Sequence, residues 1–195
     1  SYPMALVISR LRHRDLWILL VILPTWINLL LKAYAFIGLL SHDGLVNQLF
    51  GLVGIPAQHM LFTDASFILV ASYIQIPFMI LPIYNSLTDI SDSYIKASHD
   101  LGATNWQTLT KVIFPMTMPG VKSGIQIVFI PSLSLFMLSR LIGGNKIITL
   151  GTAVEEHFLT TMNWGMGSTI GVVLIIAMVI AMMLTNTQRK RRRQA

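Results

Sequence analysis

Residues 94–120, YIKASHDLGATNWQTLTKVIFPMTMPG, form the least hydrophobic long segment in a chain that is otherwise apolar almost from end to end. The residues just before this segment offer oxygen atoms that can cap a helix running to about His99: Asp89, Ser91 and Asp92. Gly102 supplies the permissive backbone at which such a helix can end. The segment therefore predicts a short helix followed by a turn.

A second short helix is expected directly after this turn. Thr104 and Gln107 have the spacing of a capping box, which predicts the start of the helix, and Pro115 is expected to end it. Its apolar residues recur at intervals of three and four: Trp106, Leu109 and Ile113. That spacing predicts a stripe that packs back on the rest of the protein.

The composition indicates a membrane protein. Of the 195 residues, 54% are hydrophobic and only 11% are charged, and the mean hydropathy is +0.67. The chain contains no cysteine, and its five histidines are far apart along the sequence with no close pairing. Neither a disulfide framework nor a metal site is therefore expected.

A helix needs about 20 mainly apolar residues to cross the hydrocarbon core of a bilayer. Windows of that kind occupy residues 16–39, 66–87, 121–142 and 166–185. Four spans place segment 88–120 on the same side as the C-terminus. Of the 14 Lys and Arg residues, only Lys32, Arg140 and Lys146 fall on the other side, so the positive-inside rule makes the side of segment 88–120 cytoplasmic. The terminal run RKRRRQA is then a topology anchor facing anionic lipid, and no nucleic-acid partner is expected.

Polar residues and prolines interrupt the first three windows. The prolines, at positions 24, 77, 82 and 131, each remove a backbone donor, which membrane helices tolerate where they pack together. The uncharged polar residues include Asn28, Gln75, Gln126, Ser132 and Ser134. They either bond to neighbouring helices or line a polar path, and the sequence leaves both interpretations open.

The first outer connection, residues 41–65, is not simply hydrophilic. Leu45, Leu49 and Leu52 recur at helical spacing, which predicts a short helix lying in the membrane interface.

Residues 96–125, KASHDLGATNWQTLTKVIFPMTMPGVKSGI, closely resemble the cytoplasmic signature loop of the permeases of ATP-binding-cassette (ABC) importers. The matching positions are Ala97, Asp100, Leu101, Gly102, Ala103, Trp106, Pro115, Pro119 and Gly120. Lys96 stands where that loop usually has Glu, and Ser98 stands where it has its second Ala. Further segments along nearly the whole chain resemble the spermidine/putrescine permeases within this family.

This resemblance implies an all-α, polytopic transmembrane bundle of the type I importer kind in the plasma (inner) membrane of a prokaryote. Residues 1–195 would form the permease domain, with segment 88–120 as its cytoplasmic coupling loop. Family members have six spans, so the chain is expected to lack the first span and most of the second. Two permease subunits would pair around the substrate path, an extracellular binding protein would deliver the polyamine, and a dimer of cytoplasmic ATPase subunits would drive transport.

The resemblance also implies which residues contact the ATPase: Lys96, Ala97, Ser98, Asp100, Leu101, Gly102 and Ala103. The chain has no GxxxxGK[ST] sequence for phosphate binding, so it is not expected to be an enzyme. ATP and magnesium are expected in the partner ATPase, with no cofactor in this chain.

A polyamine is a polycation at neutral pH, so its path is expected to offer carboxylates and aromatic faces. Candidates on the expected outer side or in nearby spans are Trp26, Tyr34, Tyr73, Glu155 and Glu156. Arg140 and Lys146 would oppose a cation unless they pair with these glutamates.

Two other functions are compatible with the sequence. The same fold could import another small solute, such as an anion, a metal chelate or a sugar. A channel or carrier that needs no nucleotide would explain the prolines and polar residues of the spans, but it would leave the loop signature as a coincidence.

Overall fold

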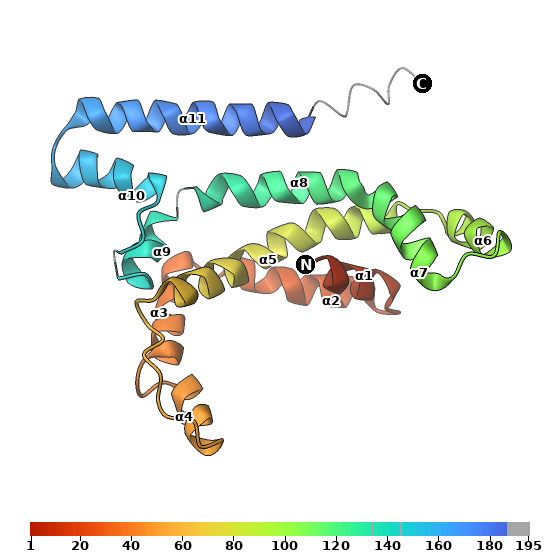
Figure 1. Cartoon of the computed structure of the whole chain (residues 1–195), viewed down its shortest axis with the longest axis horizontal. Coiled ribbons are helices and arrows are strands. Elements are labelled where there is room, and N and C mark those ends of the chain that lie inside the picture. The colour runs from red at the N-terminus through yellow and green to blue at the C-terminus, as the bar shows by residue number, and fades with distance from the viewer. Residues whose placement is uncertain (134, 145, 187–195) are drawn as a thin grey trace. The chain divides into compact units, whose positions relative to one another are not determined.

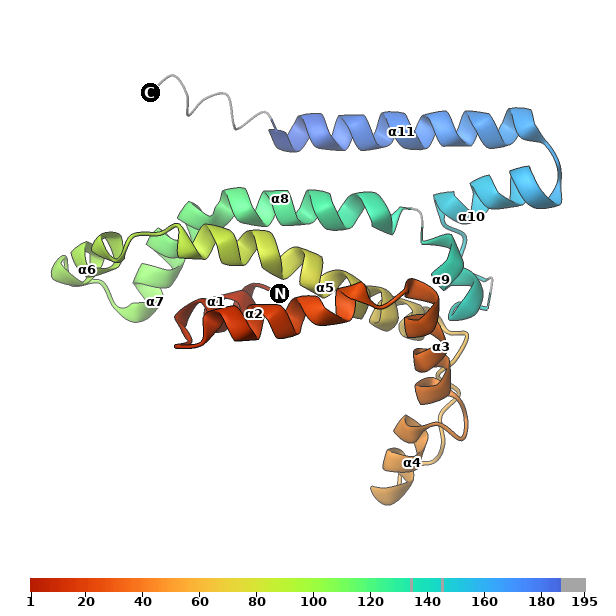
Figure 2. The ribbon, with the colours of Figure 1, turned by 180° about the vertical axis from the view of Figure 1, so that it is seen from behind.

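The computed structural model describes residues 1–133, 135–144 and 146–186, and every regular element within this part of the chain is helical (Figures 1 and 2). The α-helices are α1 (Tyr2–Arg10), α2 (Arg14–Ile22), α3 (Leu29–Leu40), α4 (Leu45–Leu52), α5 (Asp64–Thr88), α6 (Asp92–Asp100), α7 (Asn105–Thr108), α8 (Phe114–Ser132), α9 (Phe136–Leu141), α10 (Leu150–Glu155) and α11 (Trp164–Asn186). A 3-10 helix covers Leu23–Trp26, and π-helical turns cover Leu109–Ile113 and Glu156–Thr160.

Four stretches of the described chain are long and apolar enough to cross a membrane: Leu29–Leu52, Asp64–Thr88, Asn105–Ser132 and Trp164–Met183. The all-α class and the second and fourth expected spans are therefore confirmed. Pro77 and Pro82 both lie inside α5 without ending it. Ser134 and the basic residues 189–193 of the terminal run lie outside the described residues.

The first expected span, residues 16–39, is wrong as a single helix. Leu23–Trp26 form a 3-10 helix that includes Pro24, and a new helix, α3, begins only at Leu29. The side-chain oxygen of Asn28 caps α3 by accepting a hydrogen bond from the N–H of Leu30 at 2.8 Å. Asn28 therefore caps its own helix. Neither interpretation of the polar span residues, a bond to a neighbouring helix or a place in a polar path, included this role.

The third expected span is also wrong in its boundaries. α7, the π turn and α8 form one run from Asn105 to Ser132, and α9 is a separate short helix. Pro115, expected to end a helix, is the second residue of α8. Proline is tolerated there because the π turn just before it changes the backbone bonding pattern.

The chain divides into two compact units, and the first combines Ser1–Pro24 with Gln75–Val128. Its buried core consists of Ala5, Ile8, Ile80, Ile83, Tyr84, Leu87 and Ile113. These residues join α1, the second half of α5 and the π turn. The Tyr2 hydroxyl lies 2.8 Å from the Thr117 hydroxyl, and the Tyr2 ring meets Phe114 edge-on, which ties the start of α1 to α8.

Within this unit, α8 approaches α5 closely at two glycines spaced four residues apart. A methyl group added at Gly120 would clash with the Ser86 side chain and the Pro82 carbonyl oxygen, and one at Gly124 would lie 2.7 Å from the Met79 sulfur. Small residues at this spacing let membrane helices approach each other closely. This close approach at Gly120 and Gly124 was not predicted from the sequence.

The second unit combines Thr25–Ile74 with Phe129–Leu184. Its buried core consists of Ala33, Leu40, Val70, Ile74, Leu138 and Ile142, which come from α3, the first half of α5 and the α9 region. The expected short helix in residues 41–65 is confirmed as α4. The buried Asn47 anchors it through two hydrogen bonds with the backbone of Gln58, at 2.9 and 3.0 Å.

Two histidines of this unit lie close together. His42 and His59 have ring centroids 5.6 Å apart. They are distant in sequence, and only the fold of the outer connection brings them together.

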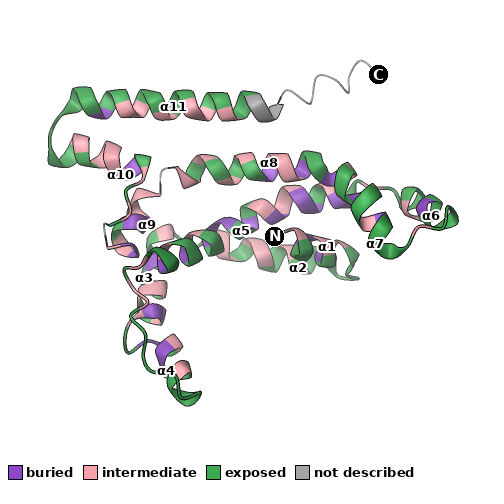
Figure 3. Cartoon of the chain, viewed as in Figure 1, coloured by how far each residue is buried: buried purple, intermediate pink, exposed green. Residues whose placement is uncertain are grey.

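α11 keeps its side chains largely exposed, as Figure 3 shows, with 6% of its most apolar window buried. That surface suits lipid or a partner helix.

Candidate functional site

The segment expected to couple to an ATPase forms α6, a tight turn and α7, which lie together beyond the ends of α5 and α8 in the first unit (Figures 1 and 2). The Ser91 hydroxyl caps α6 by accepting from the N–H of Ser93. Gly102 follows α6 with a φ of +81°, a conformation that residues with a Cβ rarely adopt. The predicted end of the helix at Gly102 is therefore confirmed.

The predicted capping box at the start of α7 is also confirmed. The Thr104 hydroxyl accepts from the N–H of Gln107 at 3.3 Å, and the Gln107 side-chain oxygen accepts from the N–H of Thr104 at 2.9 Å. Both bonds satisfy donors that the first helical turn would otherwise leave open.

A buried hydroxyl pair fixes α6 against α7. The hydroxyl oxygens of Ser98 and Thr108 lie 2.9 Å apart, and both residues are buried. Ser98 also donates to the carbonyl oxygen of Ile95 at 2.7 Å, so its oxygen accepts a hydrogen bond from the Thr108 hydroxyl. Nothing in the sequence around Ser98 or Thr108 predicts this contact. Ser98, one of the residues predicted to face the ATPase, points inward.

The other predicted coupling residues lie on the outside of the loop. Lys96, Ala97, Asp100, Leu101 and Gly102 are exposed, and Ala103 is half-buried. The side chain of Leu101 is 88% exposed, so its apolar surface is not buried against the rest of the described chain.

Trp106 was expected to pack back on the protein, and that prediction is wrong, since the residue is 72% exposed. The core of this unit reaches Leu109 and Ile113, about one and two turns further along the run, but not the first turn of α7. Tyr94, on α6, is exposed as well. We call these three exposed apolar residues of the loop, Tyr94, Leu101 and Trp106, the loop surface.

The second candidate set contains an ion pair within the second unit. A guanidinium nitrogen of Arg140, on α9, lies 2.8 Å from a carboxylate oxygen of Glu155, at the end of α10. The Glu155 side chain is 14% exposed and that of Arg140 51% exposed. Arg140 was expected to oppose a cation unless it paired with a glutamate, and it does pair with Glu155.

The segment between α9 and α10 is held so that these two charges meet. The Ser139 hydroxyl donates to the carbonyl oxygen of Ile147, and the N–H of Gly151 donates to the carbonyl oxygen of Leu133 at 3.2 Å. Thr149 and Thr152 form a capping box at the start of α10. The pair is thus a product of local folding that residue spacing alone does not predict.

The remaining path candidates are separate from this ion pair. Trp26 ends the 3-10 helix and is exposed, Tyr34 is exposed on α3, and Glu156 is exposed in the π turn after α10. The ring of Tyr73, on α5, meets Phe36 edge-on with centroids 5.0 Å apart. Among the described residues, no hydrogen bond or ring contact joins Trp26, Tyr34 or Tyr73 to either glutamate.

The described residues form helices, with four stretches apolar and long enough to cross a membrane, and α6 and the capped start of α7 lie between α5 and α8. Residues 4–194 match the family described as "Binding-protein-dependent transport system inner membrane component". The chain belongs to this family. It is therefore a multi-pass inner membrane protein, and the resemblance noted in the signature loop is confirmed.

The relatives that it matches include spermidine/putrescine transport system permease proteins called PotB. The chain is 32% identical to that of Haemophilus influenzae over 185 residues, covering 92% of this chain and 64% of the relative. It is 33% identical to that of Escherichia coli over 189 residues, covering 94% of this chain and 68% of the relative. The chain thus spans about two thirds of the length of these proteins.

A solved structure supports the fold. A bacterial ABC transporter involved in the import of alginate superposes with a TM-score of 0.80 at 19% identity, covering 97% of this chain and 72% of the other. At that identity the likeness concerns the fold alone. The expected type I importer fold is confirmed by it.

Proposed function

We propose that this chain is a permease subunit of an ATP-driven importer of polyamines, working with a second permease subunit, a cytoplasmic ATPase dimer and an extracellular binding protein. The PotB relatives, which are named for spermidine/putrescine transport, support the polyamine substrate. In this arrangement ATP and magnesium act in the ATPase, and this chain is not an enzyme.

The single observation that carries the coupling role is the exposure of the loop surface on a firmly held loop. Three large apolar side chains lie outside the core, while the Ser98–Thr108 pair and the capping box fix the backbone beneath them. Aromatic anchors on a rigid support are what protein interfaces use for most of their binding energy. The ATPase would bind here, on Tyr94, Leu101 and Trp106 together with Lys96, Ala97, Asp100, Gly102 and Ala103.

The test is copurification of the ATPase with the full-length permease pair. Leu101→Asp and Trp106→Ala are each expected to weaken ATPase binding about thirtyfold, the effect of losing roughly 2 kcal/mol at an interface anchor. Leu101→Met is the matched control, because it keeps an apolar side chain of similar volume at the same exposed position. Undiminished binding by both loop variants, with normal folding, would contradict the coupling role.

Orientation is a separate part of the proposal. The bias of basic residues places the loop and the C-terminus in the cytoplasm. In intact cells, an impermeant amine reagent is expected to leave Lys96 and Lys111 unlabelled and to label them after permeabilisation. Labelling of either lysine from outside would place the loop on the wrong side for a cytoplasmic ATPase.

The polyamine is proposed to enter near Glu155. A carboxylate that is 14% exposed and already holds a guanidinium at 2.8 Å is suited to exchange that cation for a substrate ammonium group. Glu156, Trp26, Tyr34 and Tyr73 would extend the path. Uptake of labelled spermidine by the reconstituted importer should be competed by putrescine and not by anions or sugars. Absence of competition by polyamines would instead support the same fold with another cargo.

A further inference from the structure

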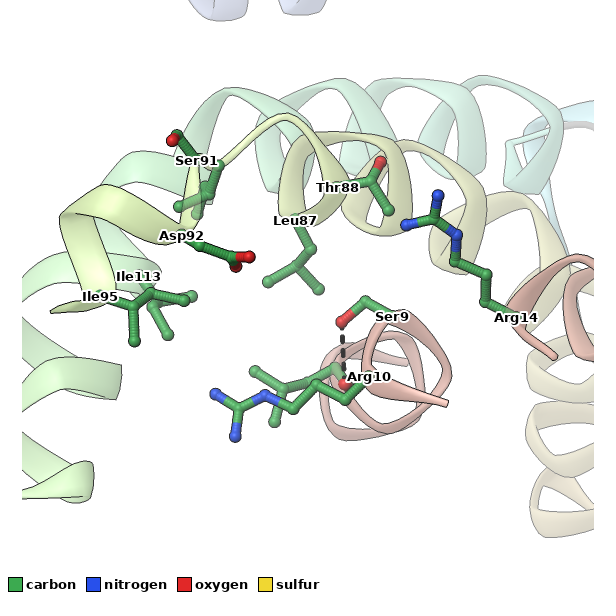
Figure 4. A pocket seen from close by; sticks show the side chains of 11 residues that line it. Ser9, Arg10, Arg14, Leu87, Thr88, Ser91, Asp92, Ile95 and Ile113 are labelled. Atoms are coloured by element: carbon green, nitrogen blue, oxygen red, sulfur yellow. Dashed lines mark hydrogen bonds between the residues drawn. The ribbon is translucent and has the colours of Figure 1, made fainter. Parts of the chain in front are cut away.

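A cavity of about 360 Å³ lies within the first unit, beside the coupling loop. The end of α1, the start of α2, the end of α5 and the start of α6 surround it, and Figure 4 shows side chains from each of them. Cavities of roughly 300–1,000 Å³ are the usual size for small-ligand sites. Neither the coupling role nor the substrate path uses this cavity.

The charges in the lining favour a singly charged anion. Arg10 is the last residue of α1, Arg14 the first of α2 and Asp92 the first of α6, so two guanidinium groups and one carboxylate share the cavity. Within the described part of the chain, Arg10 forms no ion pair, and Arg14 has only a contact of 4.0 Å with the exposed Asp15. The lining therefore has an excess of one positive charge.

The hydrogen-bonding groups narrow the ligand further. The Ser9 hydroxyl donates to the carbonyl oxygen of Leu6 at 2.9 Å, drawn as the dashed line in Figure 4. The Thr88 hydroxyl donates to the carbonyl oxygen of Asn85 at 2.9 Å. Both hydroxyls thus offer a ligand only their oxygen lone pairs, as the carboxylate of Asp92 does. The cavity suits a ligand that combines an anionic group for the arginines with hydroxyl donors for these acceptors.

The position of the cavity indicates a lipid. Thr88 is the last residue of the span α5, and the end of a span lies at the depth of the phospholipid headgroups. Leucine and isoleucine side chains, among them Leu87 and Ile113, supply apolar surface in the same lining.

We propose that this cavity binds the headgroup of phosphatidylglycerol. The side chains of Arg10 and Arg14, which extend to opposite sides of the cavity in Figure 4, would turn toward its phosphodiester, and its glycerol hydroxyls would bond to Asp92, Ser9 and Thr88. The proposal rests on the cytoplasmic orientation of the loop, because it places the site in the inner leaflet. Since Asp92 begins α6, an occupied site would connect the lipid to the helix that ends just before Leu101.

The experiment measures lipid affinity with the full-length permease pair, by titrating vesicles of phosphatidylglycerol in phosphatidylcholine and counting bound lipid by native mass spectrometry. A medium of about 1 M salt, with a Debye length of about 3 Å, suppresses general attraction between basic residues and anionic lipid. Arg10→Gln and Arg14→Gln are expected to weaken binding about tenfold each, the effect of losing a hydrogen bond to a charged group. Arg12→Gln is the matched control, since Arg12 is exposed on the same turn but does not line the cavity, and it should change affinity less than about threefold.

Four outcomes would overturn the proposal. Equal losses of lipid affinity in all three arginine variants would indicate general charge attraction. Equal binding of phosphatidylethanolamine would show that the site does not require an anionic headgroup. Displacement of the lipid by soluble glycerol 3-phosphate would make the ligand a free phosphate ester, and its displacement by the ATPase would make the cavity part of the protein interface. Because no substrate is present, a failure of spermidine import leaves this measurement unaffected, so the two proposals can fail separately.

Discussion

Replacement of Ser98 by alanine tests whether the buried hydroxyl pair fixes the coupling loop. Thr108 is 2% exposed, and its hydroxyl donates to Ser98 over 2.9 Å. Ser98→Ala would leave that donor buried without this partner, which costs about 1–3 kcal/mol. If the loss falls on local opening of the loop, amide exchange there accelerates about 5- to 150-fold, because each 1.4 kcal/mol is a factor of ten.

The assay is hydrogen–deuterium exchange of the full-length permease in lipid nanodiscs, read at the amides of Leu101 and Ala103, which donate to the carbonyl oxygens of Ala97 and Ser98. Ser93→Ala, the same change at an exposed position of α6, should leave these rates nearly unchanged. The double variant Ser98→Ala/Thr108→Val removes both polar partners and should recover most of the protection. Equal effects of Ser98→Ala and Ser93→Ala would refute the reasoning.

Three further predictions concern single positions. Gly102→Ala is expected to destabilise the end of α6 by about 1–2 kcal/mol, because the backbone has a φ of +81° although no atom lies within 4 Å of the added carbon; Gly102→Asn should cost less, and equal exchange rates in both variants and the wild type would contradict this. Gly120→Ala is expected to lower the stability by about 1–3 kcal/mol through overpacking against α5, whereas Gly171→Ala, which meets open space, should not lower it; thermal unfolding measures both, and equal effects would argue against the close contact. Glu155→Gln is expected to raise the KM for spermidine about tenfold, while Arg140→Gln should lower it by freeing the carboxylate; changes of the same sign in uptake kinetics would exclude exchange of one cation for another.

The parts of the loop that depend on neighbouring residues in sequence could be predicted. The capping box of Thr104 and Gln107 and the left-handed Gly102 are local patterns, and both were found where they were expected. Span α11 likewise followed from uninterrupted hydrophobicity, and α5 followed from an apolar window that its two prolines do not end.

The parts that depend on distant contacts could not be predicted. The π turn at Leu109–Ile113 joins α7 to α8, and nothing in the residue pattern distinguishes it from the end of a helix before Pro115. Periodicity placed Trp106 in the core because it shows which residues share a face but not how far the core extends along the helix. The pairing of Arg140 with Glu155 required the fold of the segment between them.

The junction between α7 and α8 has a mechanical consequence. The π turn at Leu109–Ile113 and Pro115 interrupt the regular hydrogen bonding there, and in Figure 1 α7 is turned away from the axis of α8. The close contact of Gly120 and Gly124 with α5 resists sliding of α8 along α5. A push at Trp106 would therefore be taken up first by the junction and would reach α8 as a tilt about the two glycines.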